Sequence, residues 1–239
     1  MAGFGHAMKK QAKPRPIHHI MNITSYPELI DYIDKMGFLP LLYTDIAGNW
    51  SADAAVDSSC RYRVFPEGGW EWKLWQWKGP ILRESGCAYG RYFRGQAGFV
   101  SRAWWPDYCN YHRSKYAAPV SGSIEETVLE TLRENGHMTT GELRDACGFT
   151  GKNMRGKMSA VIARLELGCR VVTEDFVYKT DRHGCAYGWG SALLTVTEER
   201  FGREACHPDR SPEDSYARLR QQFGHILPHA DDALLRRII

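Results

Sequence analysis

Between residues 123 and 196 the sequence holds three amphipathic helices followed by two β-branched runs, and this order constrains the fold more than any other feature. Two of the helices open on capping boxes, in which a Ser or Thr and a Glu three residues later satisfy free backbone N–H groups. The third, after Gly151, has an apolar stripe at helical spacing. The capping pairs are Ser123 with Glu126 and Thr139 with Glu142, and the stripe is Met154, Met158, Val161, Ile162 and Leu165.

The two β-branched runs, 170–180 and 187–196, are joined by the turn-rich segment 181–184. Such runs separated by a turn are predicted to pair as a hairpin. Three capped helices followed by a hairpin form the order of a winged helix-turn-helix. We therefore predict a winged helix-turn-helix domain over 121–198, with the third helix as its recognition helix.

Basic and polar side chains of this domain can reach the phosphates and base edges of DNA. The predicted contacts on the recognition helix are Lys152, Asn153, Arg155, Lys157 and Arg164, and those at the tip of the hairpin are Arg182 and His183. The pattern also fits a winged helix that contacts protein or serves as a spacer, with its lysines solvated. Exposure of the basic face distinguishes these interpretations.

An aromatic, arginine-rich α+β domain is predicted over 23–120. It opens on a helix that starts at Ser25, with Glu28 as its capping-box partner, and ends at Gly37. Further on, the alternation in 70–72 and 75–78 has the period of two that a half-buried strand needs, which predicts a small tryptophan-rich sheet. Seven of the eight tryptophans lie between Trp50 and Trp105.

The net charge of +3 hides a basic block over 60–116, which holds ten Lys and Arg against four acids and 15 of the 29 aromatic residues. Arginines beside aromatic rings can hold phosphates next to stacked, unpaired bases. The same residues also suit a tryptophan core covered by arginines. The predicted nucleic-acid contacts in this block are Lys78, Arg83, Arg91, Arg94 and Arg102.

The remaining parts of the chain are simpler. Residues 1–22 are predicted to be a disordered basic tail, with translation starting at Met1 or Met21, and 199–239 a C-terminal helical segment. No apolar run is long enough to cross a bilayer, so we expect a cytoplasmic protein without membrane contact. The seven cysteines include no C-x-x-C pair, so we predict reduced thiols and no metal, and no motif indicates a cofactor.

Catalytic motifs are absent from the sequence, which has no Walker loop, no G-x-S-x-G and no H-E-x-x-H. The acids that could act as a general base or stabilise a cation are Glu84, Glu71 and Asp45. Glu71 and Glu84 lie among aromatic and basic residues that can shift their pKa. The alternative is that each is a partner in a salt bridge.

Several longer strings resemble the AlkZ-related proteins, distant relatives of the AlkZ/YcaQ-type winged-helix DNA glycosylases. The resemblance extends from about Met21 to the C-terminus. It rests on the strings 77–81, 83–90, 98–101, 105–107, 187–190 and 227–230. It implies tandem winged helices, binding to double-stranded DNA and, in the wider family, hydrolysis of the N-glycosidic bond of alkylated bases.

Glycosylase activity in that wider family is linked to a Gln-apolar-Gln or Gln-apolar-Asp motif after the first helix. The comparable stretch here is 37–42, where Pro40 and Leu42 occupy the two polar positions. Neither side chain can position water or stabilise a cation. The sequence therefore predicts a DNA-binding protein that recognises damaged or alkylated DNA in base-excision-type repair, and a glycosylase only if the acids above supply the chemistry. The alternative is a non-catalytic interaction module or transcriptional regulator.

Overall fold

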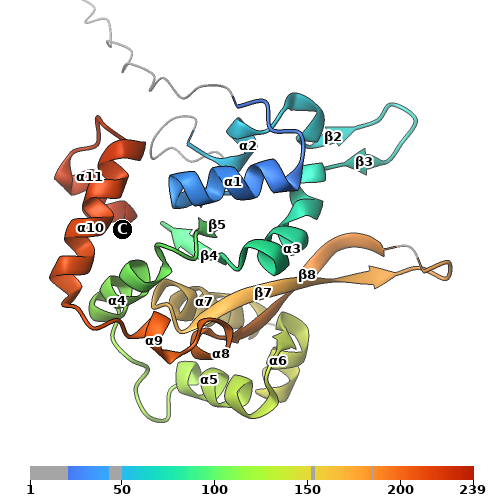
Figure 1. Ribbon diagram of the computed structural model, residues 1–239. Helices are drawn as coiled ribbons and strands as arrows, with labels where there is room; N and C mark the ends of the chain where they lie inside the picture. The colour runs from blue at the N-terminus through green and yellow to red at the C-terminus, as the bar shows by residue number, and fades with distance from the viewer. Residues whose placement is uncertain (1–20, 43–49, 152–153, 185) are drawn as a thin grey trace, which may run out of the picture.

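The computed structural model describes residues 21–42, 50–151, 154–184 and 186–239. They form an α+β fold around a six-stranded antiparallel sheet with the order β1-β5-β4-β7-β8-β6 (Figure 1). The sheet is continuous because Tyr89 of β4 pairs with Thr173 of β7. Its strands are β1 (Phe38–Pro40), β4 (Ala88–Phe93), β5 (Gln96–Val100), β6 (Met138–Thr139), β7 (Val171–Thr180) and β8 (Ala186–Val196).

The N-terminal part begins with α1 (Tyr26–Met36), which buries Leu29 and Ile33 and ends at Gly37, as predicted. Ser25 is the N-cap residue, as predicted, but the predicted capping box is incomplete because the Ser25 side chain makes no capping hydrogen bond. Glu28 instead accepts a hydrogen bond from the backbone N–H of Thr24 at 2.8 Å. The elements that follow are α2 (Ala52–Ala55), a 3₁₀ turn (Ser58–Cys60), β2 (Arg63–Val64), β3 (Trp70–Glu71), α3 (Lys73–Ser85) and α4 (Trp105–Lys115). The strands β2 and β3 form a separate two-stranded sheet.

The prediction of a strand over 75–78 is wrong, because this stretch lies in α3. A stretch of four residues is too short to distinguish the period of two of a strand from the period of about 3.6 of a helix. The longer sequence decides between the two. The buried residues Leu74, Lys78, Ile81 and Leu82 fall at i, i+4, i+7 and i+8, which is the spacing of one helical face. Only Trp70–Glu71 forms a strand here, paired with β2.

Residues 124–196 form what we call the three-helix unit, with α5 (Ile124–Asn135), α6 (Thr140–Ala146) and α7 (Met154–Leu167) packed on β6, β7 and β8. The Thr139–Glu142 capping box is complete. Ser123 caps the N–H of Glu126, whose carboxylate accepts from Gly122 rather than from Ser123. Of the predicted apolar stripe of α7, all but the half-buried Met154 is buried.

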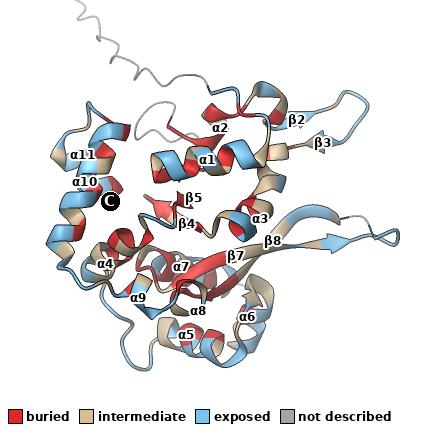
Figure 2. Cartoon of the chain, viewed as in Figure 1, coloured by how far each residue is buried: buried red, intermediate tan, exposed pale blue. Residues whose placement is uncertain are grey.

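The hydrophobic residues divide into two cores, and the C-terminal helices share the first with the N-terminal part (Figure 2). Phe223 of α10 stacks on Phe38 with 4.5 Å between ring centroids. The buried Asp107 forms ion pairs with Arg210 and Arg218. The C-terminal helices are α8 (Thr197–Phe201), α9 (Arg203–Cys206), α10 (Pro212–Ile226) and α11 (Asp232–Ile238).

Most tryptophans belong to this first core. Trp50, Trp72 and Trp105 are buried within it, whereas Trp70 and Trp189 are more than a third exposed. The described cysteines are all free, and only Cys147 among them is not fully buried. Within the described ranges, no helix is both long and apolar enough to span a bilayer, and no group of three or more His, Cys, Asp or Glu side chains is placed to hold a metal ion.

Candidate nucleic-acid interface

The N-terminal half of α7 presents a polar face to solvent. Its exposed residues are Arg155, Gly156, Lys157, Ser159 and Ala160. Within the described part of the chain, neither Arg155 nor Lys157 forms an ion pair, so both charges are available to a ligand. Glycine and alanine have little or no side chain, which lets a partner approach the helix backbone closely. Lys152 and Asn153, predicted for the same face, lie outside the described residues.

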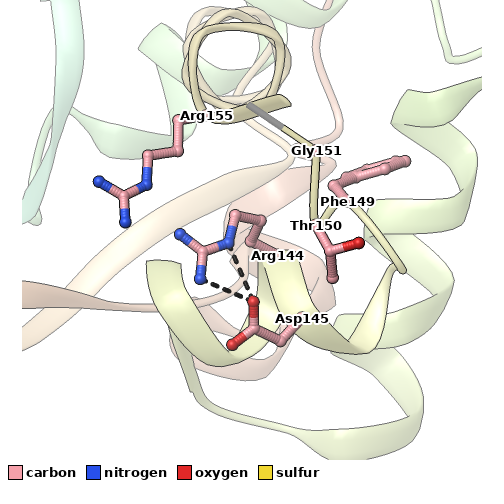
Figure 3. A pocket seen from close by; sticks show the side chains of 6 residues that line it. All are labelled: Arg144, Asp145, Phe149, Thr150, Gly151 and Arg155. Carbon is pink, nitrogen blue, oxygen red and sulfur yellow. Dashed lines mark hydrogen bonds and ion pairs between the residues drawn. The ribbon is translucent and has the colours of Figure 1, made fainter. Parts of the chain in front are cut away.

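An open hollow of about 500 Å³ lies beside this face, in the turn between α6 and α7 (Figure 3). Arg144 and Arg155 extend along it from the two helices, and Arg144 is paired with Asp145 at 2.7 Å. Phe149, Thr150 and Gly151 complete its lining. Guanidinium, hydroxyl and backbone N–H groups are the donors that bind phosphate oxygens in protein–DNA complexes.

Two of the predicted basic contacts are instead used to hold the fold together. Arg83 forms a bidentate pair with Asp175 of β7, at 2.7 and 2.8 Å. Arg164 is paired with Glu125 of α5. An arginine that is already paired has less charge to offer a phosphate. These residues therefore fit a role in holding the fold together better than the predicted contact with nucleic acid.

Arg91 also links the two parts of the molecule. Its Nε donates to Glu166 of α7 at 2.7 Å and its Nη1 donates to Ser159 at 3.1 Å. Glu166 is 4% exposed, and burial raises the pKa of its carboxyl although Arg91 acts in the opposite direction. Ser159 lies one helical turn from Arg155, so Arg91 reaches the edge of the exposed face of α7 while fixing that helix against β4.

Lys78 does not fit its predicted contact with nucleic acid, because it is 1% exposed. Its Nζ lies 3.0 Å from the ring centroid of Trp75 and 3.9 Å from that of Phe176. Burial lowers the pKa of this ammonium group to about 7. Its burial was not predicted, because 75–78 was interpreted as a strand, and the helical face that Lys78 shares with Leu74 and Ile81 was therefore missed.

The remaining predicted cations are exposed. Arg94 occupies the turn between β4 and β5 with a φ of 53°, and Arg102 precedes α4. At the tip of the β7–β8 hairpin, Arg182 donates from Nε to the Nε2 of His183 at 3.0 Å. These exposed groups remain candidates for contact with a polyanion.

The two candidate catalytic acids within the described residues, Glu71 and Glu84, are engaged separately and do not form a pair of carboxylates. Glu71 is paired with Arg63 at 2.7 Å on the β2–β3 hairpin. Glu84 is exposed on α3, where its carboxylate raises the pKa of the Tyr26 hydroxyl by accepting its hydrogen bond. Asp45 lies outside the described residues. For Glu71 the predicted alternative, a salt bridge, is confirmed.

An aromatic cluster between the β2–β3 and β7–β8 hairpins was not predicted. Trp189 of β8 stacks on Trp70 of β3, with 4.7 Å between ring centroids and 12° between planes. Tyr62 lies 6.1 Å from Trp70 and 6.4 Å from Trp189. The sequence offered one signal for it, a lone tryptophan between Gly188 and Gly190.

The model of the family described as AlkZ related matches residues 23–239. The chain belongs to the AlkZ-related family. Among solved structures, it is similar to the Streptomyces sahachiroi DNA glycosylase AlkZ, with a TM-score of 0.50 and 10% sequence identity. The match covers 91% of this chain and 60% of that one, so this chain spans less than two thirds of the glycosylase it resembles. No curated protein matches the sequence.

In this AlkZ-related protein, the stretch compared above with the glycosylase motif runs through β1. Phe38, Leu39 and Pro40 are all buried and pair with Val100, Phe99 and Gly98 of β5. Leu42 is exposed, but its side chain is apolar. No carboxamide or carboxylate is available from these positions.

Proposed function

We propose that this protein is a DNA-binding member of the AlkZ-related family, in which the three-helix unit is a winged helix that grips double-stranded DNA. Three helices followed by a hairpin, with the short β6 paired to β8, agree with that fold. Under this proposal α7 enters the major groove and the β7–β8 hairpin is the wing.

The observation that carries the proposal is the exposed, unpaired basic face at the start of α7, beside the hollow that contains Arg144. In helix-turn-helix proteins the N-terminal residues of the recognition helix contact base edges, and the preceding helix crosses the backbone. We propose that Arg155 and Lys157, near the start of α7, reach base edges and the phosphates beside them. For the second role we propose Thr150, in the turn, and Arg144, which lies on α6 and is paired with Asp145.

The proposal is tested by fluorescence polarisation with a 20-base-pair duplex over a series of salt concentrations. Each lost phosphate contact lowers the salt slope by about 1, so replacing both Arg155 and Lys157 by alanine is expected to weaken binding and lower the slope by up to about 2. Arg164→Ala is the matched control, because this arginine lies on the same helix but is paired with Glu125. The absence of binding at low salt, or an equal effect of the control, contradicts the proposal.

We further propose that the DNA recognised is damaged or alkylated, as the relation to a DNA glycosylase suggests, and that the protein is a reader rather than a hydrolase. The surface positions of Glu71 and Glu84 and the apolar β1 support the second part. A base-release assay on alkylated duplex tests it. Release that is lost in Glu84→Gln identifies an enzyme instead, whereas binding to protein but not to DNA favours the interaction module.

A further inference from the structure

The exposed apolar surface of the described residues is concentrated on two hairpins. Six of the ten exposed large hydrophobic side chains lie there: Tyr62, Val64, Trp70, Val177, Tyr187 and Trp189. The β2–β3 and β7–β8 hairpins project from the same side of the molecule (Figure 1), and the stack of Trp70 on Trp189 joins them. We call the exposed rings of Tyr62, Trp70 and Trp189 the aromatic patch.

A bulge in β8 places Trp189 in this patch. Val177 pairs with Ser191 and Lys179 pairs with Tyr187, so three residues of β8 stand opposite Tyr178 alone. Gly188 and Gly190 flank the tryptophan with φ values of 82° and 70°, in the region that favours glycine. The bulge turns Trp189 out of the hairpin and onto Trp70.

The patch is held rigidly from below. The indole Nε1 of Trp75 donates a hydrogen bond to the backbone carbonyl of Trp189 at 2.8 Å, and Trp72 stacks on Trp75 at 4.9 Å. Even so, Tyr62, Trp70 and Trp189 remain 48%, 38% and 50% exposed. Rings that are fixed in place yet open to solvent bind a flat ligand with little further loss of side-chain entropy.

The charges around the patch favour an anion. Arg63 neutralises Glu71, and Arg83 neutralises Asp175. Lys179 stands directly across the strand pair from Tyr187 and forms no ion pair within the described part of the chain. Aromatic faces with a free cation on the same hairpin as Trp189 match a nucleotide, whose base stacks while its phosphate binds the ammonium group.

We propose that the aromatic patch binds an unpaired nucleobase by stacking, with Lys179 at the neighbouring phosphate. This inference rests on the proposed function and adds to it. In this arrangement α7 binds the double-stranded DNA, and the aromatic patch binds a base that is no longer stacked in the duplex. A protein built in this way binds DNA with an extrahelical base more tightly than fully paired DNA.

The test compares a 20-base-pair duplex carrying one bulged adenine with the same duplex fully paired. The wild-type protein is expected to prefer the bulged duplex. In Tyr62→Ala and Trp70→Ala its affinity is expected to fall roughly ten-fold, since stacking on an aromatic side chain contributes strongly per base. Affinity for the paired duplex is expected to change by less than about two-fold, because α7 is untouched.

Tyr62→Phe keeps the ring and is expected to bind as the wild type, which separates stacking from any effect of the hydroxyl. Tyr216→Ala, on α10, is the control for loss of an aromatic residue outside the patch, and thermal denaturation confirms that each variant is folded. Because Tyr62 is about half exposed, its pair of variants decides the matter even if Trp70→Ala unfolds.

The outcomes are distinguishable. Wild-type binding to the paired duplex with no preference for the bulge, or equal losses on both duplexes in Tyr62→Ala, overturns the stacking proposal and leaves the proposed function intact. Failure to bind the paired duplex overturns the proposed function. If the wild type binds only the bulged duplex and Tyr62→Ala abolishes that binding, the stacking proposal stands and the proposed function is overturned.

Discussion

Replacing Arg91 by methionine is expected to destabilise the protein in a manner that depends on pH. The variant leaves the carboxyl of Glu166, which is only 4% exposed, without its charged partner. Breaking a buried ion pair costs about 3 to 5 kcal/mol. Because 30% of the Arg91 side chain is exposed and water can enter, we expect the free energy of unfolding to fall by about 2 kcal/mol at neutral pH.

The sign of the pH dependence follows from the Glu166 carboxyl. Its pKa is raised by burial, and loss of Arg91, which lowers it, raises it further. The folded variant therefore binds a proton more tightly than the unfolded chain does. The stability associated with that proton is present below the ordinary pKa of glutamate and is lost as pH rises through the folded pKa. The defect is expected to be larger at pH 8 than at pH 5.

Urea denaturation followed by tryptophan fluorescence measures the effect. With a slope of about 3 kcal/mol per molar urea, 2 kcal/mol lowers the midpoint by about 0.7 M at pH 7 to 8. Adding Glu166→Gln to Arg91→Met removes the stranded charge and is expected to restore part of the midpoint. A defect that is constant from pH 5 to 8, or that the second substitution does not relieve, refutes the reasoning.

Lys78→Met is expected to stabilise the protein near pH 6, because the lowered pKa shows that the charged form is disfavoured by burial. This gain in stability should shrink between pH 7 and 10 in urea titrations, since the folded wild type has by then released a proton that the unfolded chain still holds; a constant difference argues against a buried ammonium. Gly190→Ala should lower the free energy of unfolding by about 1 to 3 kcal/mol, because a β-carbon added at φ +70° would lie 3.0 Å from the Tyr178 ring. Gly188→Ala meets no atom within 4 Å and should lose less, so equal melting temperatures for the two variants would contradict the bulge geometry.

Local signals were sufficient for the three-helix unit. The Thr139–Glu142 box, the apolar stripe of α7 and the turn at 181–184 each act within a few residues, so their patterns can be read without knowing what packs on them. The same applies to α1, whose stop at Gly37 was predicted. Where the signal covered only four residues, at 75–78, the period was ambiguous and the strand prediction was wrong.

The candidate site depended on distant partners that no local pattern names. Arg91 and Arg155 look alike in the sequence, yet Arg91 meets a glutamate 75 residues away, whereas Arg155 meets none among the described residues. Trp70 and Trp189 come together only because α3, through Trp75, is hydrogen-bonded to β8 and the bulge in β8 turns Trp189 towards the separate β2–β3 hairpin.

The sequence by itself therefore determined α1, the helices and hairpin of the three-helix unit and the Thr139–Glu142 cap, because these depend on residues close along the chain. Only the tertiary structure decided which cations are free and which tryptophans face solvent. Pairing and burial are properties of contacts between segments, and charge and aromatic composition alone do not set them.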